Sequence, residues 1–199
     1  MIEWLFFDLG STLLDETDRV NERINEAAKL LGTDVATFLV QLEAAAKTHP
    51  YVIKMSLPDG VEWSPWPKRL DPLYPTAIPT LDALHKKYRL GVIANHGKDT
   101  AKLLGIDQFF TTYMASEIAG FGKPDLRIFE MALGQAQCVP ENAIMIGDRL
   151  DNDIYPAKKL GMKTIWVRQG FGGLVEEIPP KHEPDYTVNT LPEILDILR

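Results

Sequence analysis

Two aspartates stand directly after short apolar runs that lie far apart in the sequence. Asp8 follows Trp4-Leu5-Phe6-Phe7, and Asp148 follows Ile144-Met145-Ile146-Gly147 about 140 positions later. Short apolar runs bounded by turn residues are typical of buried strands. In open α/β sheets, ligands bind in the crevice beyond the carboxyl ends of the strands. The pattern therefore predicts that the two carboxylates share one anionic pocket.

Phosphoryl transfer is the chemistry that such a pocket favours. A carboxylate such as Asp8 can attack a phosphoryl group to give an aspartyl-phosphate, provided that a cation and positive side chains neutralise the phosphate. Asp153 lies five positions after Asp148, and hard divalent ions prefer carboxylate oxygens. The alternative for Asp8 is a residue that caps a turn. For Asp151, in the same acidic turn, a solvated or helix-capping charge is the favoured interpretation.

Three motifs resemble those of the haloacid dehalogenase (HAD) superfamily, most of whose members are Mg-dependent phosphatases. They are Asp8-Leu9-Gly10-Ser11-Thr12, Lys123-Pro124 and the acidic turn from Asp148 to Asp153. The resemblance extends over nearly the whole chain. The first motif of the family reads D-x-D-x-T, so Asp8 and Thr12 match, whereas Gly10 replaces the second aspartate.

The resemblance implies a catalytic or metal-binding role for five residues. Asp8 would be the nucleophile, and Lys123 would neutralise Asp8 and the phosphate. Asp8 and Asp148 would bind Mg²⁺ directly, and the backbone carbonyl of Gly10 would add a third ligand. Asp153 would act on the ion mainly through water. The implied cofactor is therefore Mg²⁺.

The resemblance is weaker in the second motif, which reads Ile93-Ala94-Asn95-His96-Gly97. Related proteins end this strand with a serine or threonine that bonds a phosphate oxygen, and Ala94 stands at that position. We expect Thr12, Asn95 and Lys123 to contact the phosphate. His96 is either a general acid or, as loop histidines more often are, a plain polar surface residue.

Gly10 has a chemical consequence. In the phosphatases of the family, the carboxylate that it replaces protonates the leaving oxygen and later activates water. Positioned acid-base groups contribute about 10² to 10⁴ in rate. Alkyl phosphates should suffer most from the loss, and aryl or acyl phosphates least, unless His96 or another residue substitutes.

The elements that must position these residues alternate along the chain. Short apolar runs predict strands over residues 3–8, 89–95, 112–116, 143–148 and 163–167. Helical segments are expected at 80–87, 99–104, 125–135, 153–160 and 191–198. Strands that alternate with helices predict an α/β fold, a doubly wound parallel sheet that is covered on both faces and Rossmann-like.

The stretch after the first motif breaks this alternation. Helical spacing of apolar residues predicts one helix over 18–31, ended by Gly32, and another over 35–47, before a proline-rich stretch from 50 to 79. We interpret residues 15–78 as an inserted, small helical cap and residues 1–14 and 79–199 as the core domain. The alternative is that these helices pack on the sheet edge within one domain. The residues that could contact a substrate or form the cap core are Trp63, Trp66, Lys68 and Arg69.

Composition limits the partners. The 199 residues carry 28 acidic and 21 basic side chains, a formal charge of −7, which argues against nucleic acid. The single cysteine, Cys138, excludes an intramolecular disulfide. No apolar run approaches the roughly 20 residues that span a bilayer, and no signal peptide opens the chain, so we expect a cytoplasmic protein with no membrane partner.

Three functions are consistent with these features. The first is a Mg-dependent hydrolase of a small phosphorylated metabolite that acts through an aspartyl-phosphate. The second is a degenerate, phosphate-binding or regulatory relative, since Gly10 and Ala94 lack two functional side chains. The third is a dehalogenase in which Asp8 attacks carbon without a metal. A metal-free site would have no reason to gather three aspartates, because unpaired like charges repel, so we favour the hydrolase and rank dehalogenation last.

Overall fold

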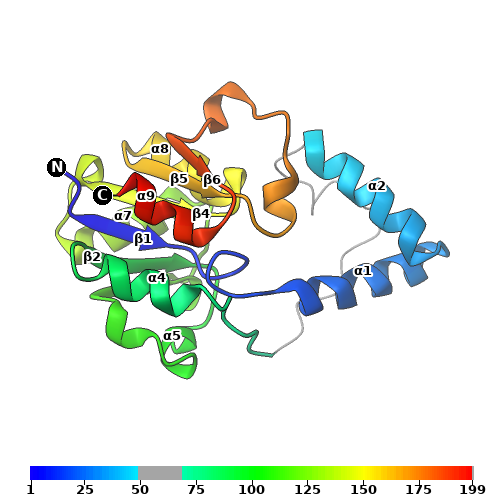
Figure 1. Cartoon of the computed structure of the whole chain (residues 1–199), viewed down its shortest axis with the longest axis horizontal. Coiled ribbons are helices and arrows are strands. Elements are labelled where there is room, and N and C mark those ends of the chain that lie inside the picture. The colour runs from blue at the N-terminus through cyan, green and yellow to red at the C-terminus, as the bar shows by residue number, and fades with distance from the viewer. Residues whose placement is uncertain (49–68, 199) are drawn as a thin grey trace.

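A six-stranded parallel sheet forms the centre of the computed structural model, which describes residues 1–48 and 69–198 (Figure 1). The strand order is β3-β2-β1-β4-β5-β6, and each neighbouring pair is parallel. The strands are β1 (Trp4–Phe7), β2 (Arg89–Ala94), β3 (Thr112–Ala115), β4 (Ala143–Gly147), β5 (Lys163–Val167) and β6 (Tyr186–Val188). The five predicted strands are confirmed.

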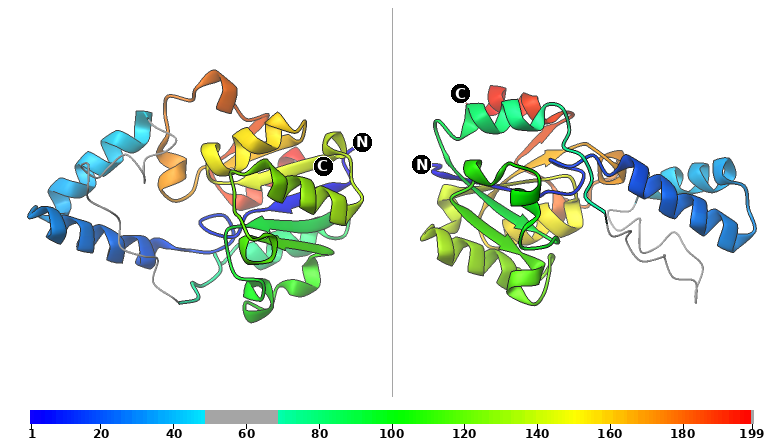
Figure 2. Two further views of the ribbon diagram at one scale, coloured as in Figure 1. Left: turned by 180° about the vertical axis from the view of Figure 1, so that it is seen from behind. Right: turned by 90° about the horizontal axis from the view of Figure 1, so that it is seen from below.

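Helices cover both faces of the sheet (Figure 2). Alternate residues of β1 point to opposite faces, as the period of a strand requires. Leu5 and Phe7 belong to a core cluster that includes residues of α4 (Ala77–Leu84), α5 (Thr100–Leu103) and α9 (Ile194–Ile197). Trp4 and Phe6 belong to a second cluster with residues of α7 (Leu126–Ala136) and α8 (Tyr155–Lys159). The predicted doubly wound α/β fold is confirmed.

Three elements differ from the sequence-based expectation. The helix expected over 80–87 begins earlier, at Ala77, because Pro79 lies in its first turn, where a helix does not need the missing N–H. The segment expected as one helix over 153–160 is a π-helical turn, Leu150–Ile154, that runs into α8. The edge strand β6 has three residues, of which only Val188 is buried, so no apolar run marked it. No helix in the described part of the chain is long and apolar enough to cross a membrane.

Helices α1 (Thr17–Leu31) and α2 (Val35–Thr48) form a hairpin that projects from the sheet (Figures 1 and 2). As predicted, α1 ends at Gly32, whose φ of 66° is left-handed. The hairpin has its own buried cluster, contributed by Ile24, Ala27, Ala28, Phe38, Leu42 and Ala46. Phe171 and Leu174, which follow β5, pack against it.

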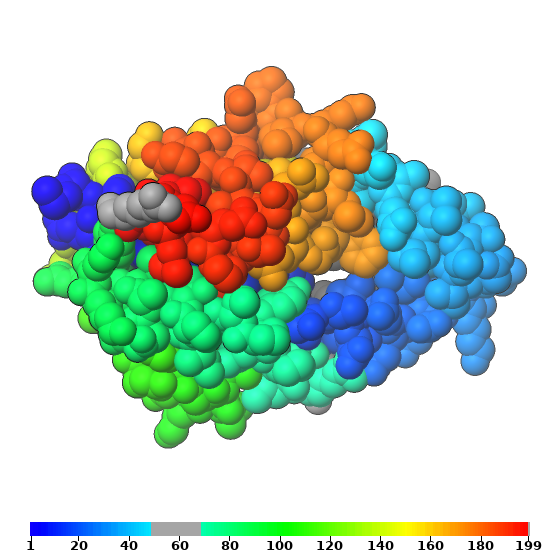
Figure 3. Space-filling view, in the orientation of Figure 1, coloured from blue at the N-terminus to red at the C-terminus, as the bar shows by residue number. Residues whose placement is uncertain are grey.

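The arrangement of the hairpin agrees with a separate helical layer, and its assignment as a cap stays a prediction. The expected cap contacts Trp63, Trp66 and Lys68 lie outside the described residues. The fourth, Arg69, pairs with Glu22 of α1 at 2.5 Å and with Asp71 at 3.4 Å. In Figure 3 the surface is hollowed where the hairpin meets the segment after β5.

Candidate active site

Asp8 follows the last residue of β1, and a tight loop carries the chain away from it. Its backbone N–H donates to the Ile146 carbonyl of β4 over 2.9 Å. The Leu9 carbonyl then accepts hydrogen bonds from the N–H groups of Thr12, Leu13 and Leu14, which folds residues 9–14 into a compact turn. This turn fixes the Asp8 carboxylate at the carboxyl edge of the sheet, where the sequence pattern predicted it.

Asp148 and Asp153 reach the same edge from β4 and the turn that follows it. The backbone N–H of Arg149 donates to Asp153 Oδ2 over 3.0 Å, so the turn holds its own carboxylate inward. Gly147 is required here, because a methyl group at this position would overlap the Asp153 carboxylate. The carboxylates of Asp8, Asp148 and Asp153 each offer an oxygen within 4.8 Å of the others.

Lys123 provides the buried positive charge of the site. Its Nζ lies 2.7 Å from Asp8 Oδ1 and 2.6 Å from Asp153 Oδ1, and the residue is 5% exposed. Burial alone would lower the pKa of Lys123, but the two carboxylates outweigh it and raise that pKa. The lysine is therefore charged and pairs with Asp8, and its role in neutralising a phosphate stays a prediction.

The excess of negative charge fits a divalent cation. Burial, together with Asp153 and Asp8, raises the pKa of Asp148 well above its usual range. Burial also raises the pKa of Asp153 to about 6, although Lys123 opposes the shift. The three buried carboxylates carry more negative charge than the Lys123 ammonium neutralises. Their oxygens are ligands that a hard dication such as Mg²⁺ prefers, and such an ion would stabilise the cluster.

Asn95 and Thr12 lie at the site but bond protein groups. Asn95 Nδ2 donates to the Lys123 carbonyl over 3.0 Å, and the Lys123 N–H donates to Asn95 Oδ1 over 2.7 Å, so Asn95 positions the lysine loop. Thr12 is fully buried, and its hydroxyl donates to Asp148 Oδ1 over 3.3 Å. Their contacts with phosphate stay predictions. Asp151 is neither solvated nor a helix cap, as the favoured interpretation had it: it is 4% exposed and pairs with Arg149 at 2.5 Å.

A pocket of about 250 Å³ opens above these residues. Its floor includes Asp8, Lys123 and Asp148, and its walls include Arg19 of α1 and Phe171. His96, Asn95 and Asn152 also line it. Burial, with Lys123 and Arg19, lowers the pKa of His96 to about 4, so its imidazole is neutral at pH 7.

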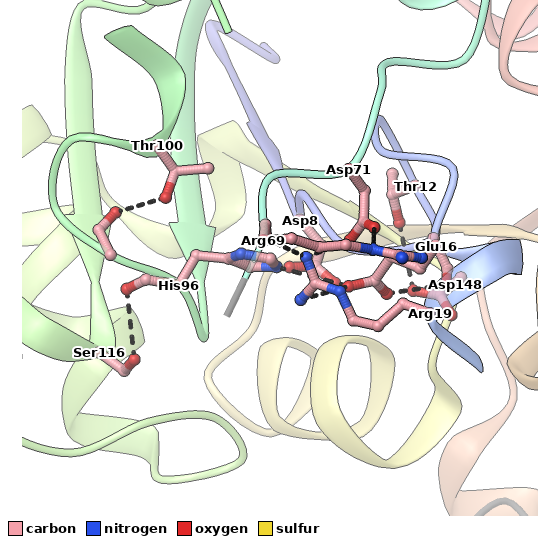
Figure 4. Close-up of polar contacts among 12 residues, drawn as sticks. Asp8, Thr12, Glu16, Arg19, Arg69, Asp71, His96, Thr100, Ser116 and Asp148 are labelled. Carbon is pink, nitrogen blue, oxygen red and sulfur yellow. Dashed lines mark hydrogen bonds and ion pairs between the residues drawn. The ribbon is translucent and has the colours of Figure 1, made fainter. Parts of the chain in front are cut away.

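Glu16 and Arg19 are among the pocket-lining residues that sequence reasoning missed. Arg19 forms an ion pair with Asp71, and Glu16 Oε1 lies 3.9 Å from Arg19 Nη1. Burial and the charge of Asp8 raise the pKa of Glu16 to about 7. Figure 4 shows Glu16 close to Asp8 and Asp148, with Arg19 and His96 directed toward it. The only signal in the sequence is an acidic pair, Asp15-Glu16, shortly after the incomplete first motif.

Comparisons with known proteins agree with the fold and the motifs. The profile of a family described as HAD-hydrolase-like matches residues 120–194. A glyceraldehyde 3-phosphate phosphatase from Pyrococcus furiosus is 41% identical over 130 residues, which are 62% of this chain and 53% of the relative. A phosphoserine phosphatase from Thermus thermophilus is 33% identical over 132 residues, 64% of this chain and 51% of the relative. The chain thus spans about half the length of these relatives.

Solved structures resemble the whole described fold. A HAD phosphatase from Thermococcus onnurineus superposes with a TM-score of 0.64 at 23% identity, covering 99% of this chain and 98% of that one. A 2-haloacid dehalogenase from Pseudomonas syringae gives a TM-score of 0.64 at 24% identity, covering 100% and 98%. Because both a phosphatase and a dehalogenase share this fold, the likeness identifies the architecture alone. The motifs, the profile matched over residues 120–194 and the relatives named phosphatases together support assignment of the chain to the haloacid dehalogenase superfamily.

Proposed function

We propose that this chain is a Mg-dependent phosphatase that hydrolyses a small phosphorylated metabolite through an aspartyl-phosphate on Asp8. One observation carries the proposal: the Asp8 carboxylate lies at the pocket floor, 2.7 Å from the Lys123 ammonium and beside Asp148. A nucleophilic carboxylate, a fixed positive charge and further oxygen ligands are the groups that phosphoryl transfer needs. The similarity to proteins named phosphatases supports the same reaction.

Each group has a role in the proposed reaction. One Asp8 oxygen attacks phosphorus, and Lys123 neutralises the charge on the phosphoryl oxygens. Asp8, Asp148 and the Gly10 carbonyl would hold Mg²⁺, with Asp153 acting through water, and the bound ion would supply further charge neutralisation. Asp153 is suited to an indirect role, because both its oxygens already bond Lys123 or the Arg149 N–H.

The substrate proposed is small and carries one phosphate. A volume of about 250 Å³ is below the roughly 300–1,000 Å³ typical of pockets for drug-sized ligands. Relatives named for glyceraldehyde 3-phosphate and phosphoserine act on molecules of that size class. Arg19 and Arg149 at the pocket wall would favour an anionic group.

The second candidate is a degenerate relative that binds phosphate with little turnover, as the absence of a carboxylate at Gly10 first suggested. A dehalogenase ranks last. Metal-free attack on carbon does not need Asp148 and Asp153. Burying these carboxylates beside the nucleophile is energetically unfavourable unless a cation neutralises them. A screen of phosphate monoesters against the chain, with Mg²⁺ and with EDTA, separates the three.

Removal of divalent cations should abolish phosphatase activity, and Mg²⁺ should restore it. In Asp148→Asn, one of two direct carboxylate ligands becomes a neutral amide, so the Mg²⁺ concentration for half-maximal activity should rise at least about 10-fold. Titration calorimetry should show the same weakening. The matched control is Asp18→Asn, which removes the same charge from an exposed position in the first turn of α1 and should shift the Mg²⁺ requirement less than about two-fold. Equal Mg²⁺ affinity in Asp148→Asn and the parent chain would refute the ligand assignment.

A further inference from the structure

The space beside Gly10 is filled by another carboxylate. A β-carbon built on Gly10 would lie 2.7 Å from Glu16 Oε2, 3.0 Å from Glu16 Cδ and 3.1 Å from Glu16 Oε1. The Glu16 carboxyl group thus occupies the volume in which a side chain at position 10 would begin. The residue that the first motif lacks would have placed its own carboxylate on this side of the Asp8 loop.

The start of α1 leaves the Glu16 side chain available for this position. Asp15 Oδ1 accepts hydrogen bonds from the Thr17 N–H over 3.1 Å and the Thr17 hydroxyl over 2.5 Å, and so caps the first turn. Glu16 is the residue that precedes α1, but its side chain makes no capping hydrogen bond. It turns instead to the pocket.

Neighbouring groups fix the orientation of Glu16. The Ser11 hydroxyl donates to Glu16 Oε2 over 3.0 Å, and the Arg19 guanidinium lies 3.9 Å from Oε1. The side chain is 12% exposed and lines the same pocket as Asp8, Lys123 and Asp148. A carboxyl group fixed in this way, yet open to the pocket, can reach an atom of a bound substrate.

We propose that Glu16 is the acid-base residue of this site and performs, from the start of α1, the task that a carboxylate at position 10 performs in related phosphatases. The proposal rests on the function proposed above. When an Asp8 oxygen bonds to phosphorus and the bond from phosphorus to the leaving oxygen breaks, the Glu16 carboxyl gives its proton to that oxygen. In the second step the Glu16 carboxylate takes a proton from water, whose oxygen bonds to phosphorus while the bond to Asp8 breaks. Phosphate leaves, and both carboxylates return to their starting states.

This assignment changes the expectation drawn from Gly10 alone. Without any acid, the site would hydrolyse aryl phosphates and leave alkyl phosphates nearly untouched. With Glu16 as the acid, the parent chain should hydrolyse both classes. The discrimination by leaving group should appear only when Glu16 is removed.

The first test is Glu16→Gln, which keeps the size and removes the proton that is transferred. Its kcat/KM for an alkyl phosphate, glycerol phosphate, should fall by about 10² to 10⁴. With an aryl phosphate, 4-nitrophenyl phosphate, the variant should still release nitrophenol rapidly in the first turnover, an initial burst, because that leaving group needs little protonation. The slower second step should then let the phosphoenzyme accumulate. The burst also shows that the variant folds and that Asp8 still attacks.

Two matched controls accompany this variant. Asp15→Asn removes the same charge one residue away and keeps an oxygen for the Thr17 cap, so it should change kcat/KM less than about three-fold. His96→Gln tests the other candidate acid beside the pocket. If His96→Gln shows the selective loss on the alkyl phosphate and Glu16→Gln does not, the acid is His96 and the proposal is wrong.

The second test moves the carboxylate back to position 10. The backbone at Gly10 is outside the left-handed region and accepts an aspartate. In the parent chain its side chain would collide with Glu16, so Gly10→Asp alone should bring no gain. In the Glu16→Ala background, Gly10→Asp should restore alkyl-phosphate turnover at least about 10-fold over Glu16→Ala, since the space beside it is then free.

The outcomes separate this inference from the function on which it rests. An active parent whose Glu16→Gln variant keeps its alkyl-phosphate kcat/KM within about three-fold would overturn the role of Glu16 and leave the phosphatase standing. An equal loss of the aryl burst and of alkyl turnover would also overturn it, because that pattern indicates a structural role. A parent with no Mg-dependent turnover on either phosphate would overturn both.

Discussion

Asp8→Asn should lower phosphatase turnover by about 10⁴-fold or more, the range seen when a catalytic nucleophile is removed. The reason is chemical: an amide nitrogen or oxygen does not attack phosphorus as a carboxylate does, so no aspartyl-phosphate forms. The loss should be severe for both aryl and alkyl phosphates, because the attacking group itself is absent whatever the leaving group. Intact-protein mass spectrometry after acid quenching should detect one added phosphoryl group on the parent chain and none on the variant.

The control for this variant is Asp18→Asn, which removes the same charge from an exposed position in the first turn of α1 and should keep full activity. Asp8→Asn should remain folded, since it relieves negative charge in a buried cluster whose members repel one another. A variant that still gains a phosphoryl group would show that the nucleophile is another residue.

Most of the sheet could be predicted from the sequence, because each central strand is buried on both faces and therefore reads as a continuous apolar run. β1 and β4 are both fully buried along their length. β6 could not be found in this way, because an exposed edge strand of three residues has no such run. Helix α4 begins before the predicted start at residue 80, because its first turn accommodates Pro79.

The convergence of Asp8 and Asp148 was predictable for a topological reason. Both end parallel strands, and parallel strands that pair, as β1 and β4 do, present their carboxyl ends at one edge. The place of Lys123 came only from the motif that it shares with the family, because nothing in the local pattern Gly122-Lys123-Pro124 distinguishes a buried lysine from an exposed one.

The position of Glu16 could not be derived from the sequence. It depends on how the turn over residues 9–14 folds back on the Leu9 carbonyl, and on Asp15 rather than Glu16 capping α1. Acidic side chains just before a helix normally interact favourably with the positive end of the helix dipole. The sequence does not show which of Asp15 and Glu16 does this and which faces the pocket. Gly10 lacks the carboxylate of the first motif, and only the structure shows that the Glu16 carboxylate lies in the space beside it.

Lys123→Met should cause the largest loss of stability among single substitutions at the site. The lysine is 5% exposed and its Nζ lies 2.7 Å from Asp8 Oδ1 and 2.6 Å from Asp153 Oδ1. Removing one partner of a buried ion pair leaves uncompensated charge and costs about 3–5 kcal/mol in the free energy of unfolding. Urea unfolding in EDTA measures this loss. Lys163→Met is the control, because the Lys163 side chain is 56% exposed and Asp185 keeps its hydrogen bonds from Thr164, so the loss should be less than about 1 kcal/mol.

Adding Asp153→Asn to Lys123→Met should recover part of the lost stability, because the second substitution removes a carboxylate that the first leaves without a cation. The asparagine can still accept the hydrogen bond that the Arg149 N–H donates to position 153. The two substitutions should therefore be non-additive by at least about 1 kcal/mol, as residues in direct contact commonly are. Strict additivity would mean that Lys123 and Asp153 do not share the buried charge balance. The argument that excess negative charge in this cluster favours a dication at Asp8 and Asp148 would then lose its support.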